Sequence, residues 1–365
     1  MTERPNTPGS DSDAEFLGWQ VTSTGAIVPL YNILVTTHPS YHSTVTGETL
    51  RSLHLRVPEA SSPYADSGPS PWQNLGIRLN HPKRAREAIE VAGLDYTVVK
   101  KPQKWTPGLQ QTMYNTVRTD TGEALGVVGA SYGPVQNRDA FAFFDKLVKD
   151  HEVVYESAGI IGSGERIWIL AKLPGYIAVH GDDIVNKYLL LTNSHDGGVP
   201  VQIKVTPIRV VCNNTLTSAW QGLRDTYNWE TADTTKHLDQ SDILFAMANS
   251  LYRQLDVTFN RMAATKITER QLREYIQTLV PNTEYPGDIE KTEEIRNDVL
   301  RLYDSGRGAH LARGTLWGAF NSVTEYTDYI MSGEDPTRRL HSIWFGRGEQ
   351  FKLKAFDLAQ RMMQA

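Results

Sequence analysis

The chain contains a single cysteine, Cys212, among its 365 residues. One cysteine excludes an internal disulfide framework and a cysteine-based zinc site. No apolar run approaches the roughly 20 residues that a membrane-spanning helix needs. The N-terminus also lacks the basic and apolar regions of a secretory signal. From these absences we expect a cytoplasmic protein with no membrane partner.

Recognisable catalytic motifs are also missing. The sequence contains no Walker loop, no H-E-x-x-H pair, no nucleophile elbow and no clustered D-x-D. Gly162 and Gly164 have the spacing of a turn, because no helix follows to make a phosphate loop. Ser194, His195 and Asp196 are consecutive, whereas the members of a catalytic triad meet through space. We therefore expect no enzyme, no cofactor and no metal site, although a site assembled from distant residues stays open.

Composition indicates a globular protein whose charge is unevenly distributed. Hydrophobic residues make up 40% and charged residues 22% of the chain, proportions typical of a globular fold. The net charge of −5 argues against a nucleic-acid coat protein, and residues 225–298 lean acidic. Residues 78–118, however, carry eight cations against three carboxylates. Such an imbalance can mark a nucleic-acid interface, but solvated helix faces also produce it.

Residues 18–228 have the alternating apolar pattern of strands, with few helices between them. A Gly-bearing connection joins residues 113–118 to 124–131 and predicts a hairpin. Asn137 is placed to cap a helix over residues 138–149. The other predicted elements are strands at 27–36, 49–57, 96–101 and 188–192, a helix at 82–92, and a hairpin pairing 152–161 with 166–173.

Residues 229–365 instead show helical periodicity. Thr268 and Gln271 form a capping-box pattern, and Thr315 is placed to cap another helix. We therefore predict an α+β protein with a mixed, mainly antiparallel sheet and packed helices, followed by a mostly helical C-terminal region. The expected organisation is a disordered tail at 1–17, an α+β domain at 18–228 and a helical region at 229–365 packed on it.

Residues 201–220 contain the clearest succession of strand, turn and helix-capping signals in the sequence. Alternation predicts a strand that ends near Pro207, since proline removes a ladder donor. Asn213 and Asn214 are good N-cap residues, so a short helix over residues 215–222 is expected. Its N-terminus could meet an anion, or the whole stretch could be a strand–helix corner of the core.

Several ordered motifs in the chain resemble the phage/plasmid-like protein family, domain of unknown function 932. The central motif is TPIRVVCNNTLTSAW, at residues 206–220. Further motifs are Leu125 to Val128, Tyr132, Val135 to Asn137, Asn193 to Gly197, Gly314 to Tyr326, and Phe345-Gly346 followed by a lysine-bearing helix. The resemblance implies a phage or plasmid product acting in the host cytoplasm, but it implies no activity and no catalytic residue.

A nucleic-acid-binding role fits the basic residues best. Single-strand binders combine cations for phosphates with aromatic faces for bases. The residues proposed for phosphate contacts are Lys100, Lys101, Lys104, Arg118 and Arg209, and Trp105 is proposed for base stacking. For Arg209 the alternative is a buried salt bridge to a carboxylate of the helical region. For Trp105 the alternative is a packed core aromatic.

Hairpins combined with helices are similar in broad organisation to Rad52-like single-strand annealing proteins. That analogy implies single-stranded DNA as a partner, self-assembly into a homo-oligomer, and a role in recombination or replication. Fold analogy does not establish function. The competing hypothesis is a non-catalytic scaffold or host-interaction protein acting through its helical half.

Overall fold

A computed structural model describes residues 14–21, 27–33, 71–72, 76–79, 84–103, 113–142, 144–198, 201–216, 241–283 and 285–364. The chain divides into two compact units, residues 1–60 and 61–365. The first unit contains an antiparallel hairpin of β1 (Ala14–Val21) and β2 (Ile27–Ile33). Strand β2 confirms the strand predicted at 27–36, and β1 begins inside the segment expected to be a tail. The strand predicted at 49–57 lies outside the described residues.

The second unit is built on a seven-stranded sheet in which every described pairing is antiparallel. Its strand order is β12-β11-β9-β8-β7-β3, and β10 also pairs with β9. The predicted hairpin of residues 152–173 is confirmed as β7 and β8, and β8 runs further than expected. The strands are β3 (Gly76–Arg78), β7 (Val154–Ile161), β8 (Arg166–Val179), β9 (Asp183–Ser194), β10 (Gln202–Val205), β11 (Ile208–Arg209) and β12 (Asn214–Thr215).

The residues after Pro207 form a tight hairpin. The prediction that a helix starts at residue 215 is therefore wrong. Asn214 pairs with Arg209, as strand β12 folds back on β11. Asn213 has φ +54, a left-handed conformation that asparagine tolerates at turns. Buried hydrogen bonds to a distant helix hold Asn214 and Thr215 in this hairpin and override the capping preference. Residues 217–222 lie outside the described part.

A second, three-stranded sheet has the order β4-β5-β6, with strands β4 (Val98–Pro102), β5 (Met113–Arg118) and β6 (Ala124–Gly129). Strands β5 and β6 confirm the predicted hairpin. Helix α2 (Ala85–Val91) ends before Gly93, whose φ of +68 turns the chain away as expected. The helix predicted at 138–149 is described as α3 (Asn137–Ala142) and α4 (Phe144–His151).

The C-terminal part is helical, as predicted. The capping box of Thr268 and Gln271 is present, and Thr315 accepts a hydrogen bond from Gly318 N. Two of the described helices were not predicted: the short α9, and α11, which Asp335 caps and Pro336 opens. The helices are α6 (Ser241–Ala264), α7 (Glu269–Leu279), α8 (Pro286–Ser305), α9 (Ala309–Ala312), α10 (Leu316–Tyr329), α11 (Pro336–Phe345) and α12 (Arg347–Met362).

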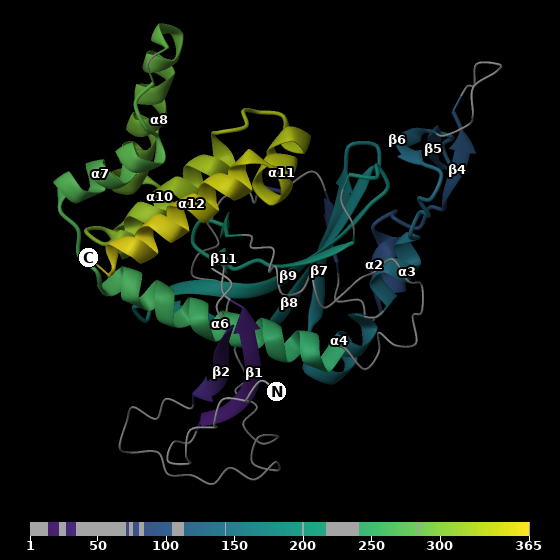
Figure 1. Ribbon diagram of the computed structural model, residues 1–365, viewed down its shortest axis with the longest axis horizontal. Helices are drawn as coiled ribbons and strands as arrows, with labels where there is room; N and C mark the ends of the chain where they lie inside the picture. Colours follow the sequence, from purple (N-terminus) through teal and green to yellow (C-terminus); the bar gives the residue numbers. More distant parts are fainter. Residues whose placement is uncertain are drawn as a thin grey trace, which may run out of the picture. The chain divides into compact units, whose positions relative to one another are not determined.

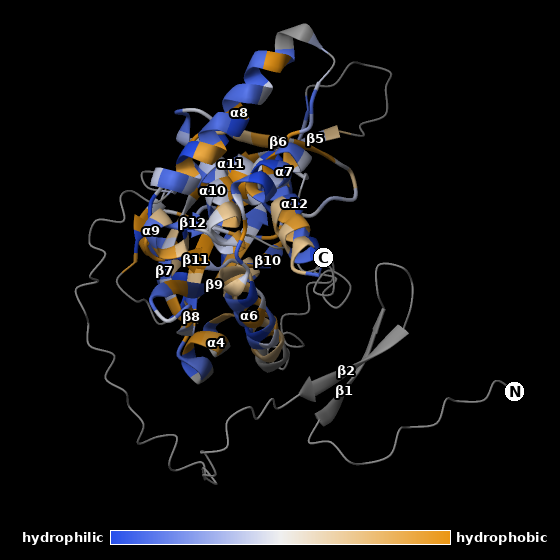
Figure 2. Ribbon diagram, turned by 90° about the vertical axis from the view of Figure 1, so that its left-hand side faces the viewer, coloured by the Kyte–Doolittle hydropathy of each residue, from blue (hydrophilic) through white to orange (hydrophobic). Residues whose placement is uncertain are grey.

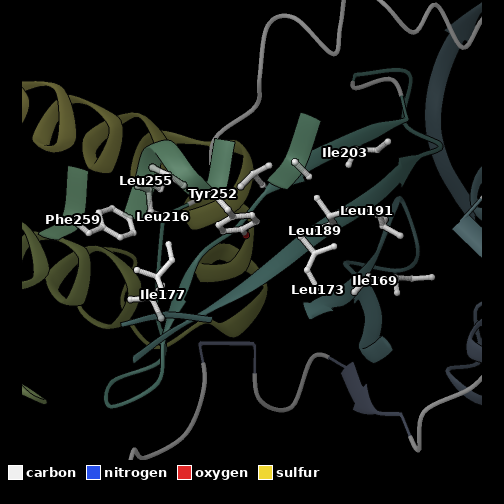
Figure 3. Packing of buried hydrophobic residues seen from close by; sticks show 14 of the residues in the cluster. Ile169, Leu173, Ile177, Leu189, Leu191, Ile203, Leu216, Tyr252, Leu255 and Phe259 are labelled. Atoms are coloured by element: carbon white, nitrogen blue, oxygen red, sulfur yellow. The ribbon is translucent and has the colours of Figure 1, made fainter. Parts of the chain in front are cut away.

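Helices cover both faces of the main sheet (Figure 1). On one face, Ile169 and Leu189 pack in the same cluster as Tyr252 and Phe259 of α6 (Figure 3). On the other face, alternate residues such as Trp168 pack in a separate cluster with α11. Because both faces are covered, β8 and β9 read as nearly continuous apolar runs. The fold is therefore α+β, as the sequence predicts.

Candidate functional site

The structure describes four of the six predicted binding residues and places them in different settings. Lys100 and Lys101 lie on β4, Arg118 ends β5, and Arg209 lies on β11. Lys104 and Trp105 lie outside the described residues. The three-stranded sheet therefore carries three of the four described candidates, and Arg209 lies on the main sheet.

Lys101 belongs to a row of side chains across the three-stranded sheet. Its cross-strand partner is Asn115, whose partner on β6 is Val127. Directly opposite residues in an antiparallel sheet share one face. Lys101 is exposed, Asn115 is half-buried and Val127 is 46% exposed. This row, Lys101–Asn115–Val127, gives the sheet a solvent-facing surface that combines a cation, an amide and an apolar group.

Lys100 points to the opposite face and is committed to internal contacts. Its Nζ donates hydrogen bonds to Ala130 O at 2.5 Å and Tyr132 O at 2.8 Å. The ammonium also lies 4.8 Å from the centroid of the Tyr114 ring. These contacts hold β4 against the turn that follows β6, so Lys100 stabilises the three-stranded sheet.

Arg118 joins the three-stranded sheet to the turn between β7 and β8. Its guanidinium forms an ion pair with Asp120 at 2.8 Å and donates to Ser163 O at 2.7 Å. It also lies 3.8 Å from the centroid of the Tyr96 ring, whose hydroxyl donates to Gly164 O. The charge of Arg118 is thus largely balanced within the fold.

Arg209 is buried, with 3% of its surface exposed. Its guanidinium forms an ion pair with Asp183 at 2.6 Å and donates to Gly308 O at 2.9 Å. Trp317 Nε1 donates to the same carboxylate at 2.8 Å. The structure thus shows the buried salt bridge that was the alternative interpretation, but its carboxylate comes from β9 rather than from the helical region. In this arrangement the guanidinium does not face solvent.

The loop at residues 193–198 holds the three-stranded sheet in place, a role that sequence reasoning missed. Thr116 Oγ1 donates to His195 O at 2.6 Å. On the loop's other side, Asn137 Oδ1 accepts a hydrogen bond from Asn193 Nδ2 and contacts His195 Nε2 at 2.7 Å. Because Asn137 Nδ2 donates to Leu94 O, the Oδ1 atom must be the acceptor, and His195 carries its proton on Nε2. Burial lowers the pKa of His195 to about 4, so the imidazole is neutral at pH 7.

Strand β6 lies very close to the same loop. A Cβ added to Gly126 would lie 2.5 Å from Asp196 Cα, so the close approach requires glycine at this position. Asp196 in turn forms an ion pair with Arg166 at 2.9 Å. The loop is therefore a structural junction between the two sheets.

The described part of the central motif, residues 206–216, also has a structural role. Asn214 Nδ2 donates to Thr324 Oγ1 at 3.1 Å, and Thr215 N donates to Asp328 Oδ2 at 2.7 Å. Asp328 also pairs with Lys352 at 2.7 Å, and neither side chain is exposed. Residues 206–215 are thus bound to α10 and α12 by a buried polar network.

Neither a metal site nor a membrane span is found in the described part of the chain. Among those residues, no group of three or more His, Cys, Asp or Glu side chains could hold a metal ion. None of the described helices is long and apolar enough to cross a membrane.

A family model described as "Domain of unknown function (DUF932)" matches residues 124–344. The chain belongs to this family. No curated protein and no solved structure matches it. The part that matches the DUF932 model includes the loop at 193–198, the ion pair of Asp183 with Arg209, and α10. Lys100, Lys101 and Arg118 precede it in the chain.

Proposed function

We propose that this DUF932 protein binds single-stranded nucleic acid through the open face of the three-stranded sheet. The observation that supports this proposal is the row Lys101–Asn115–Val127, which presents a cation beside amide and apolar groups on a solvent-facing surface. Lys104 and Trp105 follow the end of β4 by two and three residues in the sequence. Cations that contact phosphates next to groups that contact bases are the usual composition of a single-strand site.

Some residues of this proposed site contact the nucleic acid, and others hold the three-stranded sheet in position. Lys101 and Lys104 contact phosphates, and Trp105 stacks on a base. Lys100 and Arg118 hold the sheet through their internal hydrogen bonds. The activity that we propose is annealing of complementary strands during recombination or replication of a phage or plasmid.

The test is binding of a labelled single-stranded oligonucleotide across a salt series. Released counterions make such binding weaken with salt, and each lost phosphate contact flattens the logarithmic slope by about 0.7. We expect Lys101→Glu with Lys104→Glu to weaken binding at least tenfold and to flatten the slope by more than one unit. Lys291→Glu with Lys354→Glu, at exposed positions of α8 and α12, is the matched control and leaves both quantities unchanged. An annealing assay with complementary oligonucleotides then tests the activity.

A wild-type protein that does not bind at low salt would overturn this proposal, because electrostatic attraction is strongest there. The second candidate, a scaffold or host-interaction protein, would then be favoured. Its support is Tyr285 and Ile289, which are 74% and 50% exposed at the start of the largely hydrophilic helix α8 (Figure 2). Self-association that Tyr285→Ser with Ile289→Ser abolishes would identify that surface.

A further inference from the structure

The first turn of α8 presents apolar side chains to solvent. Helix α8 packs on α7, α9 and α10, and Val299 and Leu302 in its second half are buried. Its start extends beyond the helices on which it packs (Figure 1), and there Tyr285 is 74% and Ile289 is 50% exposed. These two residues are about one helical turn apart in the sequence. An exposed aromatic and aliphatic pair at the end of a helix is typical of an interaction surface.

The same segment is negatively charged. Asp288 and Glu290 flank Ile289 in the sequence, and both are exposed. Lys291 lies two residues beyond Ile289, so it faces another side of the helix. Residues 285–290, which we call the α8 tip, therefore combine apolar groups with negative charge. A surface that fits the tip combines apolar groups with a cation.

The open face of the three-stranded sheet has this complementary composition. It carries the row Lys101–Asn115–Val127, in which Val127 is 46% exposed. Met113 lies two residues before Asn115 on β5 and therefore shares this face, and it is 45% exposed. Methionine and aromatic side chains are enriched at protein interfaces. The face thus offers a cation beside two apolar side chains.

We propose that the α8 tip of one copy of this protein binds the open face of the three-stranded sheet of a second copy. Tyr285 and Ile289 pack on Met113 and Val127, and the carboxylates of the tip face Lys101. Both surfaces are exposed within one molecule, so the contact forms between molecules. Because it joins two different surfaces, each pair keeps one free tip and one free sheet face to which further copies can add.

The contact also regulates the surface proposed for single-stranded nucleic acid, and this consequence rests on the proposed function. The carboxylates of the α8 tip compete with phosphates for Lys101, so a bound strand displaces the tip. Two exposed apolar side chains on each partner make a small interface, and small interfaces are typical of transient contacts. Self-association is therefore reversible, and a bound strand reverses it.

The experiment measures self-association of the full-length protein by sedimentation velocity across a dilution series, without nucleic acid. We expect reversible association that Lys101→Glu weakens at least about tenfold, because like charges then face each other. Asp288→Lys with Glu290→Lys has the same effect, and the three changes together recover association. Glu334→Lys with Asp357→Lys, at exposed positions before α11 and on α12, is the matched control and leaves association unchanged.

Mixing two defective variants tests whether different surfaces meet. Tyr285→Ser with Ile289→Ser alters only the tip, and Lys101→Glu alters only the sheet. Where the wild type associates, each variant alone stays monomeric, but their mixture forms a complex because it contains an intact tip and an intact sheet face. A wild type that stays monomeric at every concentration overturns the inference. Association that only one of these variants loses also overturns it, because like surfaces would then meet.

Addition of a single-stranded oligonucleotide separates this inference from the proposed function. Dissociation of the complex by the strand supports both. Strand binding by a wild type that never self-associates would leave the proposed function standing while this inference fails. Self-association of a protein that binds no strand would do the reverse. A strand that binds and leaves the complex intact overturns the displacement.

Discussion

At the scale of single residues, the most distinctive polar side chains of this protein stabilise its interior. Arg209 is held by a carboxylate and a backbone carbonyl, and Trp317 donates to the same carboxylate. His195 is buried and neutral, and it joins a loop to Asn137. Arginine and histidine often act in catalysis or ligand binding, but here both side chains are held by contacts within the fold.

The buried imidazole of His195 makes stability depend on pH. Its folded pKa of about 4 lies below the ordinary value of 6.5, so the unfolded chain binds more protons between these values. Stability is therefore complete above pH 6.5 and is lost as the pH falls toward 4. The expected loss from this group is about 2 kcal/mol between pH 7 and pH 5, from 1.36 kcal/mol per pKa unit.

Urea unfolding at pH 7 and pH 5 measures this effect. His195→Gln should remove about 2 kcal/mol of the difference, whereas His310→Gln, at an exposed position on α9, should keep it. An unfolding free energy whose pH dependence is the same in wild type and His195→Gln would contradict the assignment.

At the scale of elements, the loop at residues 193–198 fixes the position of the three-stranded sheet. The hydroxyl of Thr116 donates to the loop, and Gly126 lets strand β6 approach the backbone of Asp196. The open row Lys101–Asn115–Val127 is on the other face of this sheet. A substitution that weakens the contacts between this loop and the sheet should therefore shift the proposed binding surface, although it replaces none of the residues on that surface.

Gly126→Ala tests this junction. The added methyl group would overlap Asp196, whose backbone cannot yield as a flexible side chain does, so we expect a loss of about 1–3 kcal/mol. Gly129→Ala lies on the same strand and meets nothing within 4 Å, so it should change stability by less than about 0.5 kcal/mol. Thermal unfolding of the two variants measures the contrast. Equal Tm values would show that the sheet does not depend on this close approach.

At the scale of the whole molecule, one buried charge pair joins three distant parts of the chain. Lys352 of α12 donates to Asp328 of α10 and to Thr215 of β12, each at 2.7 Å. Burial raises the pKa of Asp328 and lowers that of Lys352, while each charge opposes the shift of the other. The C-terminal helix α12 is thereby attached to the hairpin of β11 and β12 through a buried salt bridge.

Lys352→Met leaves a buried carboxylate without its counter-charge. Breaking a buried pair in this way typically costs about 3–5 kcal/mol. Lys352→Met combined with Asp328→Asn removes both charges and should recover most of that loss. Lys354→Met, at an exposed position of the same helix, is the control and should be nearly neutral. A double variant that is no more stable than Lys352→Met would contradict this account.

Local sequence signals determined much of the fold. The hairpin of β5 and β6, the capping box at Thr268 and the long amphipathic helix α6 follow from alternation, turn residues and helical spacing. These signals suffice because each element is specified by residues near one another in the chain. They also predicted Lys101 as a binding residue, and that role stays a prediction; the structure shows that Lys101 is exposed on β4.

Tertiary structure decided the features that depend on partners distant in sequence. Asp183 lies 26 residues before Arg209, and Asp328 lies 113 residues after Thr215. No local pattern predicts these pairs, so the asparagines after Arg209 were assigned to a helix cap and not to a hairpin. Register alone placed Trp168, Thr192 and Gln202 on one face. The sequence by itself thus determined which segments form strands and helices. Which charged side chains are buried and which polar side chains are exposed was decided when those segments packed. Both depend on neighbours that only folding brings together.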